Sequence, residues 1–269
     1  MNSIINKLRN LFKARPVLNE EDKSFQHECF KWLLRNIGGD EFYKNTHLVL
    51  PTKEYFPSVV ASEEEAVVET FNKVKSYAGM ESWNCKLEAQ DEDPSVLVAP
   101  TVALQGVESS PLGTFNVGPG DEVTISYNPV LIGNPTSLVA TFAHELAHYL
   151  TATIEEDPPG GWDNWEFATD ICSVFLGFGI FAANSAVSFR QYTDIDSQGW
   201  HFSRSGYLTE AEYSYALGLF MELKECDIQL AYPYCDPNIK VFLKKSIREI
   251  RDSNIVSELL KIEYIDRNS

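Results

Sequence analysis

The sequence is poor in basic residues and contains no long hydrophobic run. It carries 22 Lys and Arg against 39 Asp and Glu, which gives a formal net charge of −17. This excess of acid argues against non-specific binding of nucleic acids, because such binding depends on a basic surface. The most apolar stretch, residues 171–183, is shorter than the roughly 18 residues that a transmembrane helix needs. We therefore expect no membrane-spanning segment.

Paired cysteines are missing as well. The chain has five cysteines, none of them in a C-x-x-C pair: Cys29, Cys85, Cys172, Cys226 and Cys235. Their odd number and the lack of a signal-peptide pattern predict reduced thiols in a cytoplasmic protein. Internal repeats and low-complexity linkers are also lacking. With 44% hydrophobic residues over 269 positions, the chain can bury a substantial core as one large or two small domains.

The first 18 residues differ from the rest of the chain. Residues 1–18 carry basic residues and no acidic one, and their apolar residues recur on one helical face. A basic amphipathic helix of this kind can lie on an anionic membrane surface. The acidic remainder of the chain favours a second interpretation, in which the arm docks on this protein's own body or on a sister subunit.

The remaining residues, 19–269, predict one α+β domain. Apolar periodicity and capping residues predict helices at 20–37, 62–78 and 236–251, and a further helix after Thr209. Alternation and turn residues predict short strands at 47–50, 84–87, 96–102 and 121–128. Residues 19–160 would thus form a mixed α/β half with a small sheet, and residues 161–269 a mainly helical half.

The most informative stretch is His144-Glu145-Leu146-Ala147-His148, an H-E-x-x-H motif. Four residues along an α-helix correspond to about 400° of rotation, so both imidazoles emerge one turn apart on nearly the same face. Two neutral imidazoles at that spacing can bind one Zn²⁺. Glu145 points about 100° to the side, toward a water on the metal rather than toward the metal itself.

The residues around the motif predict a buried helix. Most of them are apolar, and Asn134-Pro135 supplies a cap followed by a proline in the first turn. Buried His and Glu side chains cost free energy unless a partner satisfies them. A metal ion is the simplest such partner. The competing interpretation has no metal, and in it His144 and His148 pack neutral in a core beside a polar network.

A third protein ligand is expected on a second helix, because catalytic zinc sites usually have three protein ligands and one open position. Segment 165–183 is apolar almost all round, which is typical of a buried helix. Its few polar residues are spaced so that they form one stripe: Glu166, Thr169, Asp170 and Ser173. We expect Glu166 to be the third ligand and Asp170 to accept a hydrogen bond from a ligand histidine.

Two alternatives remain open for this segment. Asp163-Asn164-Trp165-Glu166 has the form of a helix-capping box, in which Glu166 would bind only the backbone. Capping does not explain why Asp170 lies on the same buried face. Asp170 is itself the other candidate for the third ligand.

Taken together, His144-Glu145-x-x-His148 and Glu166-x-x-x-Asp170 resemble the gluzincin branch of the zincin metallopeptidases. In that branch a Glu on a second helix is the third ligand, and an Asp one turn later supports the first His. The resemblance covers residues 121–183, less than a quarter of the chain. It implies a zincin-like fold with Zn²⁺ at the junction of the two halves and a peptide or protein as substrate.

The reaction implied by the resemblance is hydrolysis of a peptide bond. Zinc lowers the pKa of its water toward about 7 and polarises the scissile carbonyl, while Glu145 takes the proton and passes it to the leaving amine. This scheme needs no covalent intermediate, in keeping with the absence of a nucleophile motif such as G-x-S-x-G. Gluzincins stabilise the oxyanion with a Tyr or His, for which His201 and Tyr207 are candidates here, followed by Tyr192.

Two further interpretations concern the role of the strand at 121–128 and of the zinc. In zincins the corresponding edge strand binds the substrate backbone, although the alternation of residues 121–128 fits an internal strand equally well. The unassigned oxyanion donor leaves open a binding or regulatory protein that keeps a vestigial or structural zinc. A purely structural site, however, would have no need of Glu145.

Overall fold

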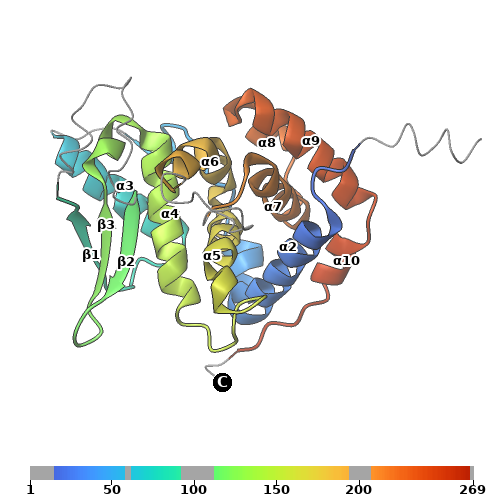
Figure 1. Ribbon diagram of the computed structural model, residues 1–269, viewed down its shortest axis with the longest axis horizontal. Helices are drawn as coiled ribbons and strands as arrows, with labels where there is room; N and C mark the ends of the chain where they lie inside the picture. The colour runs from blue at the N-terminus through green and yellow to red at the C-terminus, as the bar shows by residue number, and fades with distance from the viewer. Residues whose placement is uncertain (1–14, 58–61, 92–111, 194–206, 267–269) are drawn as a thin grey trace, which may run out of the picture.

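The computed structural model describes residues 15–57, 62–91, 112–193 and 207–266, without the side chains of residues 189–193. This part of the chain is an α+β structure built on both sides of one long helix, α4 (Pro135–Thr151) (Figure 1). A small sheet lies on one side, and the helices within residues 20–33, 165–193 and 210–259, here called the helical body, lie on the other. The predicted class is therefore confirmed at this coarse level.

The sheet has three strands in the order β1-β3-β2, namely β1 (Lys86–Ala89), β2 (Gly113–Val117) and β3 (Val123–Tyr127). β1 runs parallel to β3, whereas β2 is antiparallel to it. Buried and half-buried residues alternate along β3, as its sequence pattern predicts. However, β3 is the central strand, so of the two interpretations of residues 121–128 the internal strand is confirmed and the substrate-binding edge strand is wrong. In the described part of the chain, the edge strand on that side is β2.

Two predicted helices of the N-terminal half are confirmed, and one predicted strand is not formed. Helix α2 (Glu20–Leu33) continues into a π-helical turn, here called a wide turn, at Leu34–Gly38, and a second one covers Glu41–Asn45. Helix α3 (Glu63–Tyr77) begins after its cap Ser62. The segment 47–50 has no regular secondary structure and forms no strand; its Val49 N–H donates to the carbonyl of Gly177. The strand expected at 84–87 lies at β1, and the strand expected at 96–102 lies outside the described residues.

The apolar segment 165–183 is two helices rather than one. Helix α5 (Trp165–Ser173) ends in a wide turn at Val174–Phe178, and α6 (Gly179–Thr193) follows. Gly177 has φ +99°, and a Cβ there would collide with the carbonyl oxygen of His47, so the turn requires glycine. The chain 47–49 crosses the helix at this point, which explains the break.

The expectation that no stretch is long enough to span a membrane is wrong for this same region. Residues Trp162–Ser188 have the length and the composition of a spanning helix, but 83% of their most apolar window is buried inside the fold. The core helix of a soluble protein passes the same test.

The C-terminal half is helical, as predicted. It contains α7 (Glu210–Leu223), α8 (Ile228–Ala231), α9 (Pro237–Arg251) and α10 (Ile255–Leu259). Short 3-10 turns cover Pro129–Gly133, Trp162–Asn164 and Tyr232–Tyr234. Thr209 and Glu212 make both hydrogen bonds of the predicted capping box, and α9 begins after Asp236 with Pro237, also as predicted.

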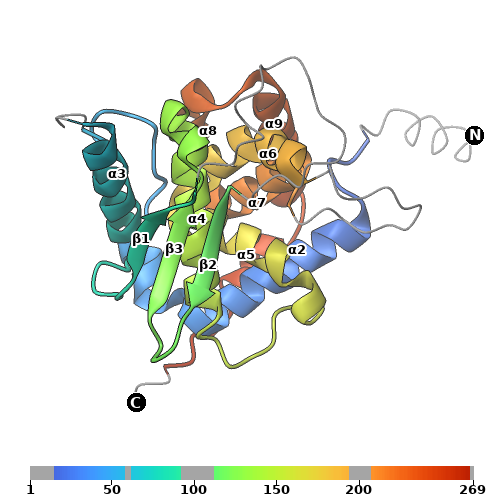
Figure 2. The same ribbon diagram turned by 60° about the vertical axis from the view of Figure 1, so that its left-hand side comes forward.

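Helix α4 joins the two halves. It contacts α3, β2 and β3 on one side and α5 and α6 on the other (Figure 2). One hydrophobic cluster extends from Leu18 to Leu259 and includes buried residues of both halves. Of the expected N-terminal arm, residues 1–14 lie outside the described residues, and the Val17 N–H donates to Glu249 Oε1 on α9. The motif on α4 therefore lies where the sheet and the helical body meet.

Candidate metal centre

The H-E-x-x-H motif lies on a buried helix that begins as predicted. Asn134 caps α4 by accepting a hydrogen bond from the Ser137 N–H at 3.2 Å, and Pro135 is the first helical residue. The rings of His144 and His148 project from successive turns with centroids 4.6 Å apart. Both side chains are buried, so their ring nitrogens need partners within the protein or a bound ligand.

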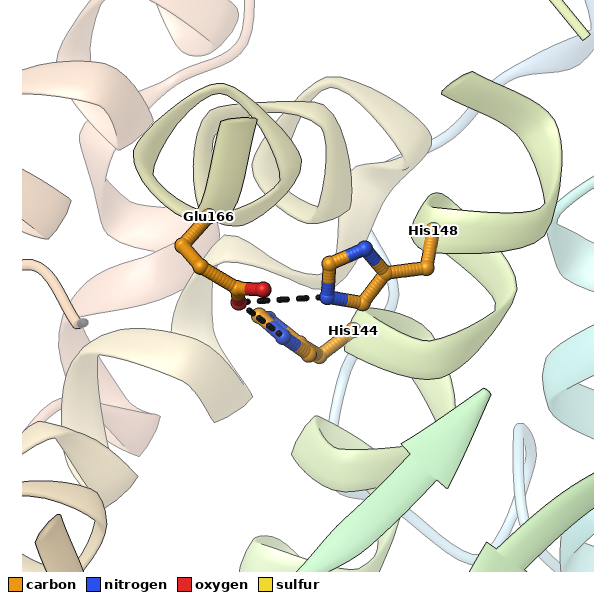
Figure 3. A group of neighbouring side chains, drawn as sticks. All are labelled: His144, His148 and Glu166. Atoms are coloured by element: carbon orange, nitrogen blue, oxygen red, sulfur yellow. Dashed lines mark hydrogen bonds and ion pairs between the residues drawn. The ribbon is translucent and has the colours of Figure 1, made fainter. Parts of the chain in front are cut away.

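Glu166, at the start of α5, faces both imidazoles (Figure 3). Its Oε2 lies 3.5 Å from His144 Nε2 and 3.2 Å from His148 Nε2. One potential ligand atom from each of the three residues lies within 4.8 Å of the others. The side chain of Glu166 thus points at the imidazoles. The alternative, in which it would bind the backbone at the start of its own helix, does not agree with this orientation.

The other ring nitrogens of the two histidines bind the same polar stripe of α5. His144 Nδ1 lies 2.8 Å from Asp170 Oδ1, and His148 Nδ1 lies 3.3 Å from Thr169 Oγ1. Asp170 Oδ2 also accepts from the Leu208 N–H at 2.8 Å. Because Asp170 contacts Nδ1 and Glu166 contacts Nε2, the geometry favours Glu166 over Asp170 as a third ligand. The contact of Thr169 was not predicted, although its place on the stripe was.

The charges within this cluster perturb its ionisable groups strongly. Burial raises the pKa of Glu166, but hydrogen bonds to His144 and His148 outweigh burial and hold that pKa far below its usual value. Burial lowers the pKa of His144, yet Asp170 and Glu166 raise it well above the usual value. For His148, burial dominates and the pKa is lowered despite Glu166. A concentration of perturbed groups like this is typical of functional sites.

Glu145 lies beside the cluster and under the edge strand β2. Its side chain is only 4% exposed, and burial raises its pKa to about 7, with further contributions from the charges of Glu166 and Asp170 against that of His144. A Cβ on Gly113 of β2 would lie 2.8 Å from Glu145 Oε1 and 2.5 Å from Thr141 Cγ2. The strand can therefore lie this close to Glu145 only because residue 113 is glycine.

The approach of β2 to Glu145 was not predicted from the sequence. The alternation of Thr114 and Asn116 with Phe115 and Val117 is a weak strand signal over only five residues. Nothing in that pattern indicates which helix the strand covers.

Of the three candidate oxyanion donors, the structure places one at the site. Tyr207 lines a narrow gap, too small for a water molecule, together with Leu112, Gly113, Thr141, His144 and Glu145, and its ring centroid lies 5.3 Å from that of His144. Burial and the nearby carboxylates raise the pKa of Tyr207, so its hydroxyl keeps its proton at neutral pH. His201 lies outside the described residues, as does the side chain of Tyr192.

Two aromatic rings contact the second histidine. The Phe115 ring is nearly parallel to that of His148 at 6.3 Å between centroids, and the Trp165 ring meets it edge-on at 4.7 Å. The Trp165 indole N–H donates to Thr151 Oγ1 at 2.9 Å, which fixes the orientation of this ring. The sequence motif did not reveal either neighbour.

Comparison of the chain with protein-family models, with curated proteins and with solved structures finds no match. Any proposal about function therefore rests on the geometry and chemistry of the site.

Proposed function

We propose that the protein is a zinc-dependent peptidase of the gluzincin type, in which His144, His148 and Glu166 hold the metal. The observation that carries this proposal is the convergence of both His Nε2 atoms and the Glu166 carboxylate while each Nδ1 is engaged on α5. Two imidazoles and one carboxylate form a donor set that catalytic zinc sites use. A carboxylate behind a ligand histidine, as Asp170 lies behind His144, is the usual support for such a ligand.

Each residue of the site has a role in this proposal. A bound zinc ion would supply Lewis acidity for a carbonyl oxygen and an activated water. Glu145 accepts the proton of the attacking water and passes it to the leaving amine, and burial raises the pKa of its carboxyl to about 7. That pKa belongs to the metal-free site, and a nearby cation favours the carboxylate form that accepts the proton. Tyr207 donates its hydroxyl proton in a hydrogen bond to the oxyanion.

The proposal includes a zincin-like fold, with a revised place for the substrate backbone. Among the described strands, β2 is the edge strand beside α4, so an extended peptide would pair with β2 rather than with β3. The α+β organisation, with α4 between sheet and helical body, supports this arrangement.

One observation favours the alternative of a binding or regulatory protein. In the described part of the chain, the gap beside Glu145 that Leu112, Gly113 and Tyr207 line has no room for a water molecule, so a substrate reaches Glu145 there only if these residues move. A site that never opens would bind metal without cleaving peptides. The two functions therefore predict the same metal stoichiometry and different catalysis.

The test combines metal analysis with peptide cleavage. Protein loaded with zinc and dialysed should retain one zinc per chain, and it should cleave peptides in a defined mixture analysed by mass spectrometry. Glu145→Gln should retain zinc and lose at least about 100-fold in cleavage rate, the lower range for a general base. The matched control, Glu63→Gln at the exposed start of α3, should change neither.

Two outcomes would contradict the proposal. If Glu145→Gln cleaves as fast as the parent protein, Glu145 is not the base. Stoichiometric zinc without cleavage of any peptide would support the binding protein instead.

A further inference from the structure

Among the described residues, the candidate metal cluster is most open at Glu166. The side chain of Glu166 is 49% exposed, whereas those of His144 and Asp170 are buried. Glu145 is buried too, beneath β2. A ligand that approaches the cluster therefore passes the start of α5, where Glu166 lies. The residues around that entrance determine which ligands are favoured.

Two tryptophans form a continuous aromatic path from His148 to the surface at this entrance. The Trp165 ring lies 4.7 Å from the His148 ring, and the Trp162 ring lies 5.4 Å from the Trp165 ring. Trp162 is 53% exposed. Because this exposed indole lies next to a cluster of convergent polar groups, it is available as an apolar contact for a ligand bound there.

The hydrogen-bonding groups of both indoles are already used within the protein. Trp162 Nε1 donates to Asp157 Oδ1 at 3.0 Å, and Trp165 Nε1 donates to Thr151 Oγ1 at 2.9 Å. The parts of these side chains that remain for a ligand are carbon edges and ring faces. Such surfaces favour an apolar partner, and an aromatic one most of all.

The loop that carries Trp162 is fixed to the helical body. Glu156, in the connection between α4 and α5, binds Arg35 and Asn36 through its carboxylate, and its carbonyl accepts the Trp32 indole N–H at 3.0 Å. All three partners lie on α2 or in the wide turn that follows it. A contact surface held in place before binding loses little entropy when a ligand docks.

We propose that Trp162 and Trp165 form a subsite for a bulky aromatic side chain of the substrate peptide. This inference rests on the proposed function and specifies its substrate class. A residue of an extended peptide spans about 3.3 Å. The distances from the His148 ring to Trp165 and from Trp165 to Trp162 therefore place Trp162 within about three residues of the peptide bond at the metal. Substrates are thus peptides with an aromatic residue close to the cleaved bond.

The experiment uses three capped dipeptide hydroxamates, because a hydroxamate group binds zinc and needs no catalysis. The probes are N-acetyl Phe-Ala, Ala-Phe and Ala-Ala hydroxamate, titrated calorimetrically into zinc-loaded protein. One of the two Phe probes should bind more tightly than Ala-Ala. Trp162→Ala should weaken that probe by about 3- to 10-fold, the range for an aromatic pair, and leave Ala-Ala unchanged.

Two further variants sharpen the result. Trp162→Phe keeps an aromatic ring and should retain most of the preference. Tyr264→Ala removes an exposed aromatic residue near the C-terminal end of the described chain, and should alter none of the three affinities.

Three outcomes would overturn the subsite while leaving the metal site intact. In the first, Trp162→Ala still binds the preferred Phe probe more tightly than Ala-Ala. In the second, Trp162→Ala loses the same affinity for all three probes. In the third, the parent protein is a dimer in sedimentation and Trp162→Ala is a monomer. The last result would make Trp162 a contact between two copies of the chain. If zinc-loaded parent protein binds none of the probes, the open metal position of the proposed function is wrong, and the subsite is wrong with it.

Discussion

The two imidazoles of the site are held in different ways. His144 binds Asp170, a fully buried carboxylate that also accepts from the backbone of Leu208. His148 binds the neutral hydroxyl of Thr169 at the longer distance of 3.3 Å, and its ring contacts those of Phe115 and Trp165. The first histidine is thus oriented by a charge-assisted hydrogen bond within the core, and the second mainly by packing near the open side.

The two histidines therefore differ in the strength of the hydrogen bond that orients each ring. A hydrogen bond to an ionised acceptor is roughly twice as strong as one between neutral groups. We therefore expect metal affinity to depend most on the ligands, then on Asp170, then on Thr169, and not on β2. The following four predictions test that order.

The largest loss of metal affinity is expected from Glu166→Ala. The variant removes a direct ligand, so zinc affinity measured by competition with a chromogenic chelator should fall by more than the roughly 10- to 100-fold typical of an outer-shell partner. The half-exposed position of Glu166 should allow the variant to fold. Asp163→Ala, which removes an exposed carboxylate one turn earlier, should keep the parent affinity; an equal loss in both variants would show that only general charge matters.

The second loss is expected from Asp170→Asn. Asparagine keeps the size of the side chain but removes the charge that orients His144, so zinc affinity should fall by about 10- to 100-fold. The same chelator competition measures it. Unchanged affinity would mean that Asp170 contributes to the fold alone.

A smaller loss is expected from Thr169→Val. Valine has nearly the same shape and lacks the hydroxyl that binds His148, which corresponds to about 3- to 10-fold in affinity for one neutral hydrogen bond. Thr169→Ser keeps the hydroxyl and should stay close to the parent. If Thr169→Val loses as much as Asp170→Asn, the contrast between the two histidines is wrong.

No change in metal affinity is expected from Gly113→Ala, in spite of its effect on catalysis. The added Cβ would displace Glu145, which does not bind the metal, so peptide cleavage should fall by about 10- to 100-fold at unchanged zinc affinity. The added Cβ would also collide with Thr141 Cγ2, which should lower the thermal stability. Thr141→Ser removes this second collision and leaves the one with Glu145. The double variant should therefore regain thermal stability but not cleavage. Full recovery of cleavage would show that Glu145 was not displaced.

The helices that carry the site could be predicted from the sequence, because their signals are local. Asn134-Pro135 marks the start of α4, and the stripe from Glu166 to Ser173 stands out in an otherwise apolar helix. Helical geometry then places both imidazoles on one face of α4 and the polar residues on one face of α5. The contact between these two faces comes from the packing of the helices.

The features that could not be predicted depend on contacts between distant segments. The break at Gly177 comes from the crossing of residues 47–49, while apolar periodicity continues through it. Strand order decides that β3 is central and that β2 is at the edge of the three described strands, and alternation along one strand carries no information on its neighbours. The aromatic neighbours of His148 come from β2 and from the first residue of α5, so they too depend on contacts between distant segments.

The most direct test of the account is the position of zinc in crystals of the loaded protein, located by anomalous diffraction at the zinc absorption edge. We expect one ion about 2.0–2.1 Å from the Nε2 atoms of His144 and His148, bound also by the Glu166 carboxylate, with a further position filled by solvent. An ion bound elsewhere, a fourth protein ligand, or no ion between α4 and α5 would contradict it.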